Sequence, residues 1–121
     1  MKLSIIVAAS VIAFAADMAL VQPRDLAGQL SASGPAIIHV GPNVLYRSKH
    51  IPASVYAGPG NSPAGILMLK AAAEKLPRTR EIAIYCGCCP WDRCPNIKPA
   101  IEALHDMGFA KVKALYLPTR V

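Results

Sequence analysis

Residues 81–108 have the sequence EIAIYCGCCPWDRCPNIKPAIEALHDMG, and the order of apolar, turn-forming and polar residues in this stretch decides the fold. Glu81–Tyr85 is a short apolar run of the kind that forms a buried strand. Asn96 can cap a helix, and Gly108 suits the left-handed position just past the end of a helix. Between them, apolar residues and one histidine recur at helical spacing: Ile97, Ala100, Ile101, Leu104 and His105. The stretch therefore predicts a strand, a cysteine-rich loop and a helix.

The alternation of strands and helices continues on both sides of this stretch. Strands are expected at Ala36–Val40, Val55–Ala57, Glu81–Tyr85 and Lys111–Leu117. A further helix is expected at Pro23–Ala32, and another begins at Ser62, which can cap it, and ends before Pro77. Pro42–Ala53 is expected to be irregular. Alternating elements of this kind predict an α/β fold, a small parallel sheet flanked by helices on both faces.

The chain has 121 residues, enough for one domain, and 54% of them are hydrophobic, which excludes a disordered chain. Its beginning has the pattern of an export signal: Lys2 supplies a positive charge and Leu3–Phe14 is apolar. Cleavage is expected after Ala15, so that residues 1–15 form a signal peptide and residues 16–121 a single domain. The mature protein is then exported, periplasmic or extracellular, and has no further segment for membrane association.

The formal net charge is +6 at pH 7, and its basic residues are scattered along the sequence. Nucleic-acid binding usually requires basic residues gathered on one surface, often interleaved with aromatic residues, so we expect no nucleic-acid partner. A basic chain of this size attracts small anions.

All four cysteines lie within nine positions: Cys86, Cys88, Cys89 and Cys94. A disulfide framework would spread its cysteines to join distant segments, so this clustering predicts a site. A thiol between a strand end and a helix N-terminus is favoured as thiolate by loop amides and the helix dipole, and Arg93 can add a positive charge. Because thiolate is the reactive form, covalent catalysis is the chemistry expected of this loop.

Several segments resemble the rhodanese domain family, and the resemblance covers roughly Leu26 to Leu117. Ile82–Cys86 matches the strand that leads to the family's active cysteine, and Met107–Phe109 with Val112 matches the end of the next helix and the strand after it. His50–Ala53 is similar to the family's "gHIPGA" segment. Ala36–Val40 stands at the place of the family's first core strand. The resemblance implies a rhodanese-like fold and a thiosulfate sulfurtransferase that needs no cofactor and no metal.

By this resemblance, Cys86 carries a persulfide and passes sulfane sulfur from a small anion such as thiosulfate to a thiophilic acceptor such as a protein thiol. Arg93 attracts the donor and is the third catalytic candidate, after Cys86 and Cys88. The strand end favours Cys86 as nucleophile, whereas loop length favours Cys88, because Arg93 is seven positions after the first and five after the second. The remaining loop residues are candidates for substrate binding: Gly87, Cys89, Trp91, Asp92 and Cys94.

Three other functions remain open. The close spacing of Cys86, Cys88 and Cys89 suits a thiol-redox module. Four thiolates can also hold zinc or copper(I), although adjacent Cys88 and Cys89 are not expected to face the same ion. The third alternative is a non-catalytic binding module with the same fold.

Other side chains have a structural interpretation. Trp91 is expected to pack over the loop rather than to stack on substrate, and Asp92 to stabilise a turn. His39 is expected to be a hydrogen-bonded core residue, and His50 to order its loop through a hydrogen bond.

Overall fold

The computed structural model describes residues 18–31 and 33–117, so the predicted signal peptide, residues 1–15, lies outside the described residues. The chain forms a five-stranded sheet with the strand order β1-β5-β4-β2-β3, and every pair of neighbouring strands is parallel. The strands are β1 (Leu20–Val21), β2 (Ala36–His39), β3 (Val55–Tyr56), β4 (Ile82–Tyr85) and β5 (Val112–Leu115). The central strand is therefore β4, the strand that leads into the cysteine-rich loop.

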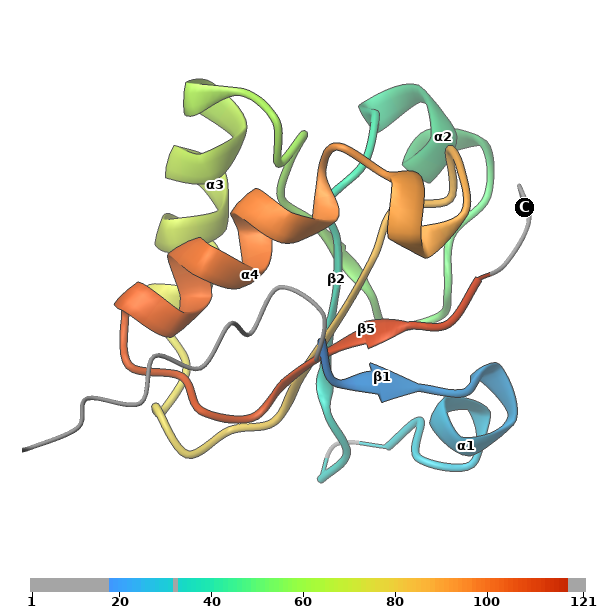
Figure 1. The fold of residues 1–121 in the computed structure, drawn as a ribbon. Helices are drawn as coiled ribbons and strands as arrows, with labels where there is room; N and C mark the ends of the chain where they lie inside the picture. Colours follow the sequence, from blue (N-terminus) through green and yellow to red (C-terminus); the bar gives the residue numbers. More distant parts are fainter. Residues whose placement is uncertain (1–17, 32, 118–121) are drawn as a thin grey trace, which may run out of the picture.

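Four α-helices accompany the sheet in the described residues: α1 (Pro23–Ala27), α2 (Asn43–Ser48), α3 (Pro63–Glu74) and α4 (Ile97–Asp106). Helices α3 and α4 lie together on one side of the sheet, and α1 lies on the other (Figure 1). A short 3₁₀ helix, Trp91–Arg93, interrupts the loop between β4 and α4. Within the described residues, no helix combines the length and the apolar character needed to cross a bilayer.

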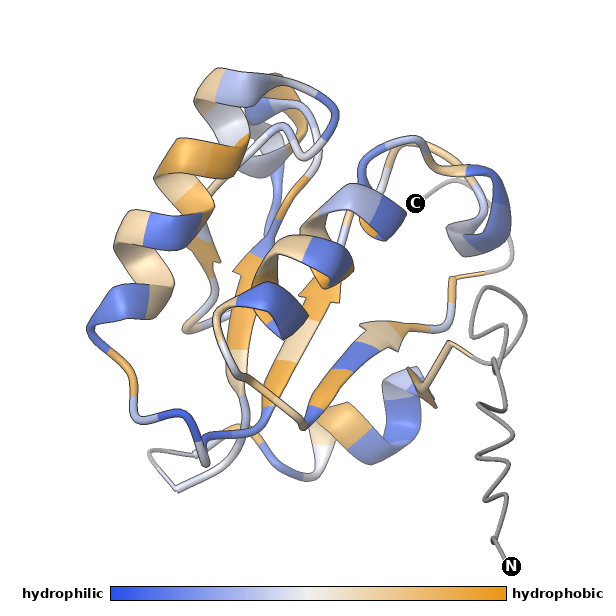
Figure 2. Cartoon of the chain, turned by 60° about the vertical axis from the view of Figure 1, so that its left-hand side comes forward, coloured by the Kyte–Doolittle hydropathy of each residue, from blue (hydrophilic) through white to orange (hydrophobic). Residues whose placement is uncertain are grey.

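Both faces of the sheet carry apolar side chains, and helices cover both of them. Ile38 and Ile84 belong to the core under α3 and α4, whereas Ile37 and Ala83 belong to the core on the α1 side. Successive residues of a strand point to opposite faces, so a strand buried on both faces is continuously apolar rather than alternating. Figure 2 shows this concentration of apolar residues on the central strands between the helices.

The predicted α/β architecture, a parallel sheet with helices on both faces, is confirmed. The start of α3 was also predicted correctly: Ser62 Oγ accepts a hydrogen bond from the Gly65 amide at 3.0 Å, and Pro63 occupies the first turn. Gly108 follows α4 with φ 102°, the left-handed conformation expected of it.

Three predictions for other segments were wrong or incomplete. Pro42–Ala53 was expected to be irregular, but it contains α2. This helix buries no residue, so its sequence has no apolar face that would have predicted it. The first helix ends at Ala27, with Gly28 as its C-cap, rather than at residue 32. Strand β1 was not predicted, since it consists of two residues that pair with β5.

Candidate functional site

The site lies at the carboxyl end of the central strand, where ligands bind in parallel α/β sheets. Cys86 follows β4 directly and lies beside the residues that follow β2. Gly41 is one of these residues, and a Cβ atom added to it would lie 2.8 Å from Cys86 Sγ and would also meet the Cys86 carbonyl oxygen. The backbone after β2 can therefore approach Cys86 only because residue 41 has no side chain.

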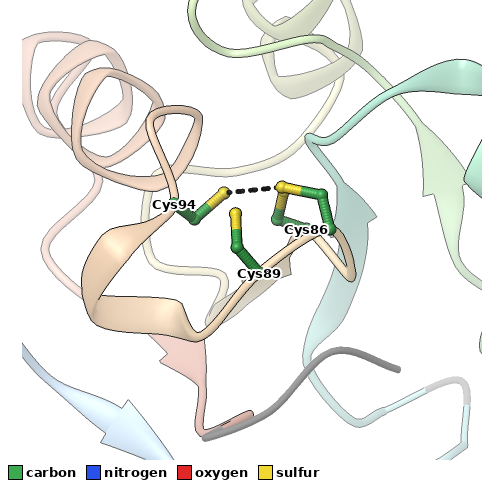
Figure 3. Close-up of side chains that lie close together, drawn as sticks. Cys86, Cys89 and Cys94 are labelled. Atoms are coloured by element: carbon green, nitrogen blue, oxygen red, sulfur yellow. Dashed lines mark hydrogen bonds between the residues drawn. The ribbon is translucent and has the colours of Figure 1, made fainter.

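The loop brings all four cysteine sulfurs together. Cys86 Sγ lies 3.1 Å from Cys88 Sγ, and Cys88 Sγ lies 3.7 Å from Cys94 Sγ. All four sulfurs, including that of Cys89, lie within 4.8 Å of one another. Figure 3 shows the side chains of Cys86, Cys89 and Cys94 pointing toward a common centre, and none of the four cysteines is in a disulfide.

The convergence of Cys88 and Cys89 corrects an expectation from the sequence. Adjacent Cys88 and Cys89 were not expected to face the same ion. Gly87 has φ 81°, a left-handed conformation that turns the chain directly after Cys86, and the loop beyond it is irregular. Without the alternation of a strand, Cys88 and Cys89 both direct their sulfurs to the cluster.

Asn96 is a site residue whose role the sequence did not reveal. Its side chain is buried, and its Nδ2 donates to Cys86 Sγ at 3.3 Å and to Cys94 Sγ at 3.7 Å. Its Oδ1 accepts from the Asn61 amide at 3.0 Å. The prediction that Asn96 caps α4 is therefore wrong for the side chain: it occupies the N-cap position, but its polar atoms are used by the sulfurs and by Asn61.

The cluster has a buried and a half-buried part. Cys86 and Cys94 are 3% and 7% exposed, whereas Cys88 and Cys89 are half-buried. Burial, followed by the hydrogen bond with Cys89, raises the pKa of Cys88 to about 12. The hydrogen bond with Cys86, followed by burial, raises the pKa of Cys94. Both shifts oppose the thiolate form at Cys88 and Cys94, whereas the sequence predicted an anionic thiol in this loop.

Arg93 and Asp92 lie in the 3₁₀ helix and are exposed. Among the described residues, the Arg93 guanidinium forms no hydrogen bond to a sulfur and no ion pair. The cluster is thus gathered by the loop and by Asn96, and not by a cation.

Trp91 connects the loop to the segment that follows the neighbouring strand β5. Its amide donates to the Leu117 carbonyl at 2.9 Å, and its ring lies 6.2 Å from that of Tyr116, centre to centre. This contact agrees with the predicted packing role of Trp91. The segment after β5 therefore supports the cysteine loop.

His39, at the end of β2, is surrounded by aromatic rings next to the site. It is 1% exposed, and its Nδ1 accepts from the Gly41 amide at 3.1 Å, as expected of a hydrogen-bonded core residue. The rings around it are those of Tyr46, Tyr56 and Tyr85. Burial lowers the pKa of His39 to about 4, so the ring is neutral at pH 7 and keeps Nδ1 as an acceptor.

An apolar groove of about 660 Å³ lies on the α1 side of the sheet and meets the site at Gly87 and His39. Its apolar lining includes Leu26, Leu30, Leu45, Ile51, Leu115 and Leu117. His50, at its edge, forms the hydrogen bond expected of it, from Nδ1 to the Tyr46 carbonyl at 2.8 Å. The groove is thus a second feature of the surface beside the cysteine loop.

Four neighbouring thiols can perform nucleophilic chemistry, exchange disulfides or bind a soft metal ion.

No protein-family model matches the chain, and no curated protein matches its sequence.

Proposed function

We propose that the protein is a rhodanese-like sulfurtransferase in which Cys86 carries sulfane sulfur as a persulfide. The observation that carries this proposal is the place of Cys86. Its thiol directly follows the central strand and accepts a hydrogen bond from Asn96 Nδ2 at 3.3 Å. A donor aimed at the sulfur stabilises a negative charge on it, both as thiolate and as persulfide.

The reaction has two displacement steps. The Cys86 thiolate attacks the outer sulfur of thiosulfate, the S–S bond of the donor breaks, and sulfite leaves with the bonding electron pair. An acceptor thiolate then attacks the outer sulfur of the persulfide, the new S–S bond forms on the acceptor, and the Cys86 thiolate is restored. No redox partner is needed for this cycle.

Two features of the surroundings support an anionic donor. The chain has a formal net charge of +6, and Arg93 is exposed on the same loop. Cys86 itself is only 3% exposed, so the side chains of the loop must move to admit the donor. The half-buried Cys88 and Cys89 belong to the segment that would move.

The test is a thiosulfate-dependent assay with a thiol acceptor on the wild type and on the four single Cys→Ser variants, all reduced and free of metal. We expect Cys86→Ser to abolish turnover. The other three variants make the same Cys→Ser change and should retain some turnover. Activity that survives Cys86→Ser and disappears with Cys88→Ser would assign the nucleophile to Cys88. A wild type that transfers no sulfur would refute the proposal.

Intact mass spectrometry after exposure to thiosulfate separates this function from thiol redox chemistry. A persulfide adds the mass of one sulfur atom, whereas a disulfide removes two hydrogen atoms. The gain should be absent from Cys86→Ser. Loss of two hydrogens without any gain of sulfur would favour the redox module instead.

A further inference from the structure

The four cysteine sulfurs have the spacing of a tetrahedral thiolate site. A zinc–sulfur bond is about 2.3 Å long, so neighbouring sulfurs of a regular tetrahedron lie about 3.8 Å apart. The two separations between sulfurs in hydrogen-bond contact are 3.1 and 3.7 Å, and all others are within 4.8 Å. The four sulfurs therefore already lie close to the spacing that one tetrahedral ion requires.

From this geometry we propose that Cys86, Cys88, Cys89 and Cys94 together bind one divalent metal ion of the zinc type. The site goes beyond sulfur transfer, and it does not depend on the protein's being a sulfurtransferase. The set of donors decides the class of metal: among the described residues the cluster contains thiols and no carboxylate or imidazole. Sulfur donors select soft or borderline ions over Mg²⁺ and Ca²⁺, and four ligands close a tetrahedral site.

Asn96 completes the site from outside the ligand shell. Its Nδ2 donates to Cys86 Sγ and Cys94 Sγ, the two most buried ligands, and its own position is fixed by the Asn61 amide. Hydrogen bonds to coordinated thiolates hold the ligands in place and offset their charge. Binding of the ion releases the thiol protons to solvent, and no electron is transferred.

The ion and the persulfide both require Cys86 Sγ, so they exclude each other. This consequence rests on the proposed function: the metal-loaded protein transfers no sulfur, and removing the metal restores transfer. The metal site itself stands without it.

The experiment uses the full chain, reduced and stripped of metal. Titration with Zn²⁺ against a chromophoric chelator measures stoichiometry and affinity, and X-ray absorption on the zinc-loaded wild type measures the ligand shell. We expect one ion per chain, with four sulfur neighbours at about 2.3 Å. A stoichiometry far below one, or a shell of nitrogen and oxygen, would overturn the proposal, and neither measurement requires a variant to fold.

Variants then identify the ligands. Each single Cys→Ser change should weaken zinc affinity, and Asn96→Ala should weaken it about 10- to 100-fold, as loss of a hydrogen bond to a ligand does. Asn43→Ala is the matched control, because it makes the same change at an exposed position of α2 and should leave affinity unchanged. Unchanged affinity in a variant with all four cysteines replaced, shown by circular dichroism to be folded, would contradict the assignment.

The outcomes for the two proposals are separate. Zinc binding is measured without thiosulfate, and sulfur transfer is measured on the metal-free protein. A chain that binds zinc but transfers no sulfur refutes only the sulfurtransferase. A chain that transfers sulfur but binds no zinc refutes only the metal site.

Discussion

At the scale of single residues, Gly41 and His39 fix the backbone beside Cys86. Gly41 leaves the space that Cys86 Sγ occupies, and its amide donates to His39 Nδ1 at 3.1 Å. Gly41 thus provides the space beside the Cys86 sulfur, and the hydrogen bond to His39 holds the Gly41 backbone in place.

Gly41→Ala should destabilise the fold by about 1–3 kcal/mol, because the added methyl group meets backbone and sulfur that have little room to move. The Cβ would lie 2.8 Å from Cys86 Sγ and 3.0 Å from His39 Cε1. The matched control is Gly28→Ala, whose Cβ would meet nothing closer than 3.6 Å and whose φ is −77°. Urea unfolding measures both, and equal stability of the two variants would disprove the crowding.

His39 makes stability depend on pH. Burial lowers its pKa from 6.5 to about 4 in the folded protein, so the unfolded chain binds more protons between these values. Its contribution to stability is complete above about pH 6.5 and decreases as the pH falls toward 4. The groups that face it are the rings of Tyr46, Tyr56 and Tyr85, with His50 nearby.

His39→Asn should reduce this pH dependence, because asparagine can accept the Gly41 amide but does not titrate. The measurement is the urea midpoint at several pH values from 4 to 7. His105→Asn, at an exposed position of α4, is the control, and its urea midpoint should vary with pH as it does in the wild type. An equal slope in His39→Asn and wild type would show that another group is responsible.

At the scale of elements, α3 shows how a helix is held by one face. Leu69 is fully buried against the sheet, whereas Leu67, two positions earlier in the same helix, is 68% exposed. Leu69→Ala should therefore cost about 2–5 kcal/mol. Leu67→Ala makes the same truncation at a solvent-exposed position and should change stability by less than about 0.5 kcal/mol. Denaturant unfolding of the two variants tests this; similar losses would mean that α3 is not packed as described.

The same contrast explains which elements could be predicted from the sequence. Strand β4 has a buried apolar run, and α3 and α4 each have a buried apolar face, with the Ser62 cap before α3 and Gly108 after α4, so pattern and structure agree. Helix α2 buries no residue, and β1 depends on β5 for its pairing, so neither leaves a local pattern. Burial determines which elements can be recognised in advance.

For the site, the position of Cys86 at the end of β4 was predictable, because it follows from the strand alone. The convergence of Cys88 and Cys89 was not, because it depends on the backbone of an irregular loop. The contact between Asn96 and the sulfurs was not predictable either, since the capping position suggested another partner.

At the scale of the whole molecule, the proposed metal site couples the loop to global stability. An ion that binds only the folded chain stabilises it by about 4 kcal/mol when its free concentration is 1,000 times the dissociation constant. We expect zinc to raise the thermal midpoint of the wild type and chelation to return it. The Cys89→Ser variant should show a smaller rise, and an equal rise in both would mean that zinc acts elsewhere.

The nine-residue span of the four cysteines has a consequence for how the protein folds. Joining the ends of so short a segment sacrifices little chain entropy. The parallel sheet, by contrast, pairs strands that are distant along the chain, such as β1 and β5, and pairings of this kind form slowly. Closing the cysteine loop therefore adds little to the entropic cost of folding, and most of that cost comes from the pairing of distant strands.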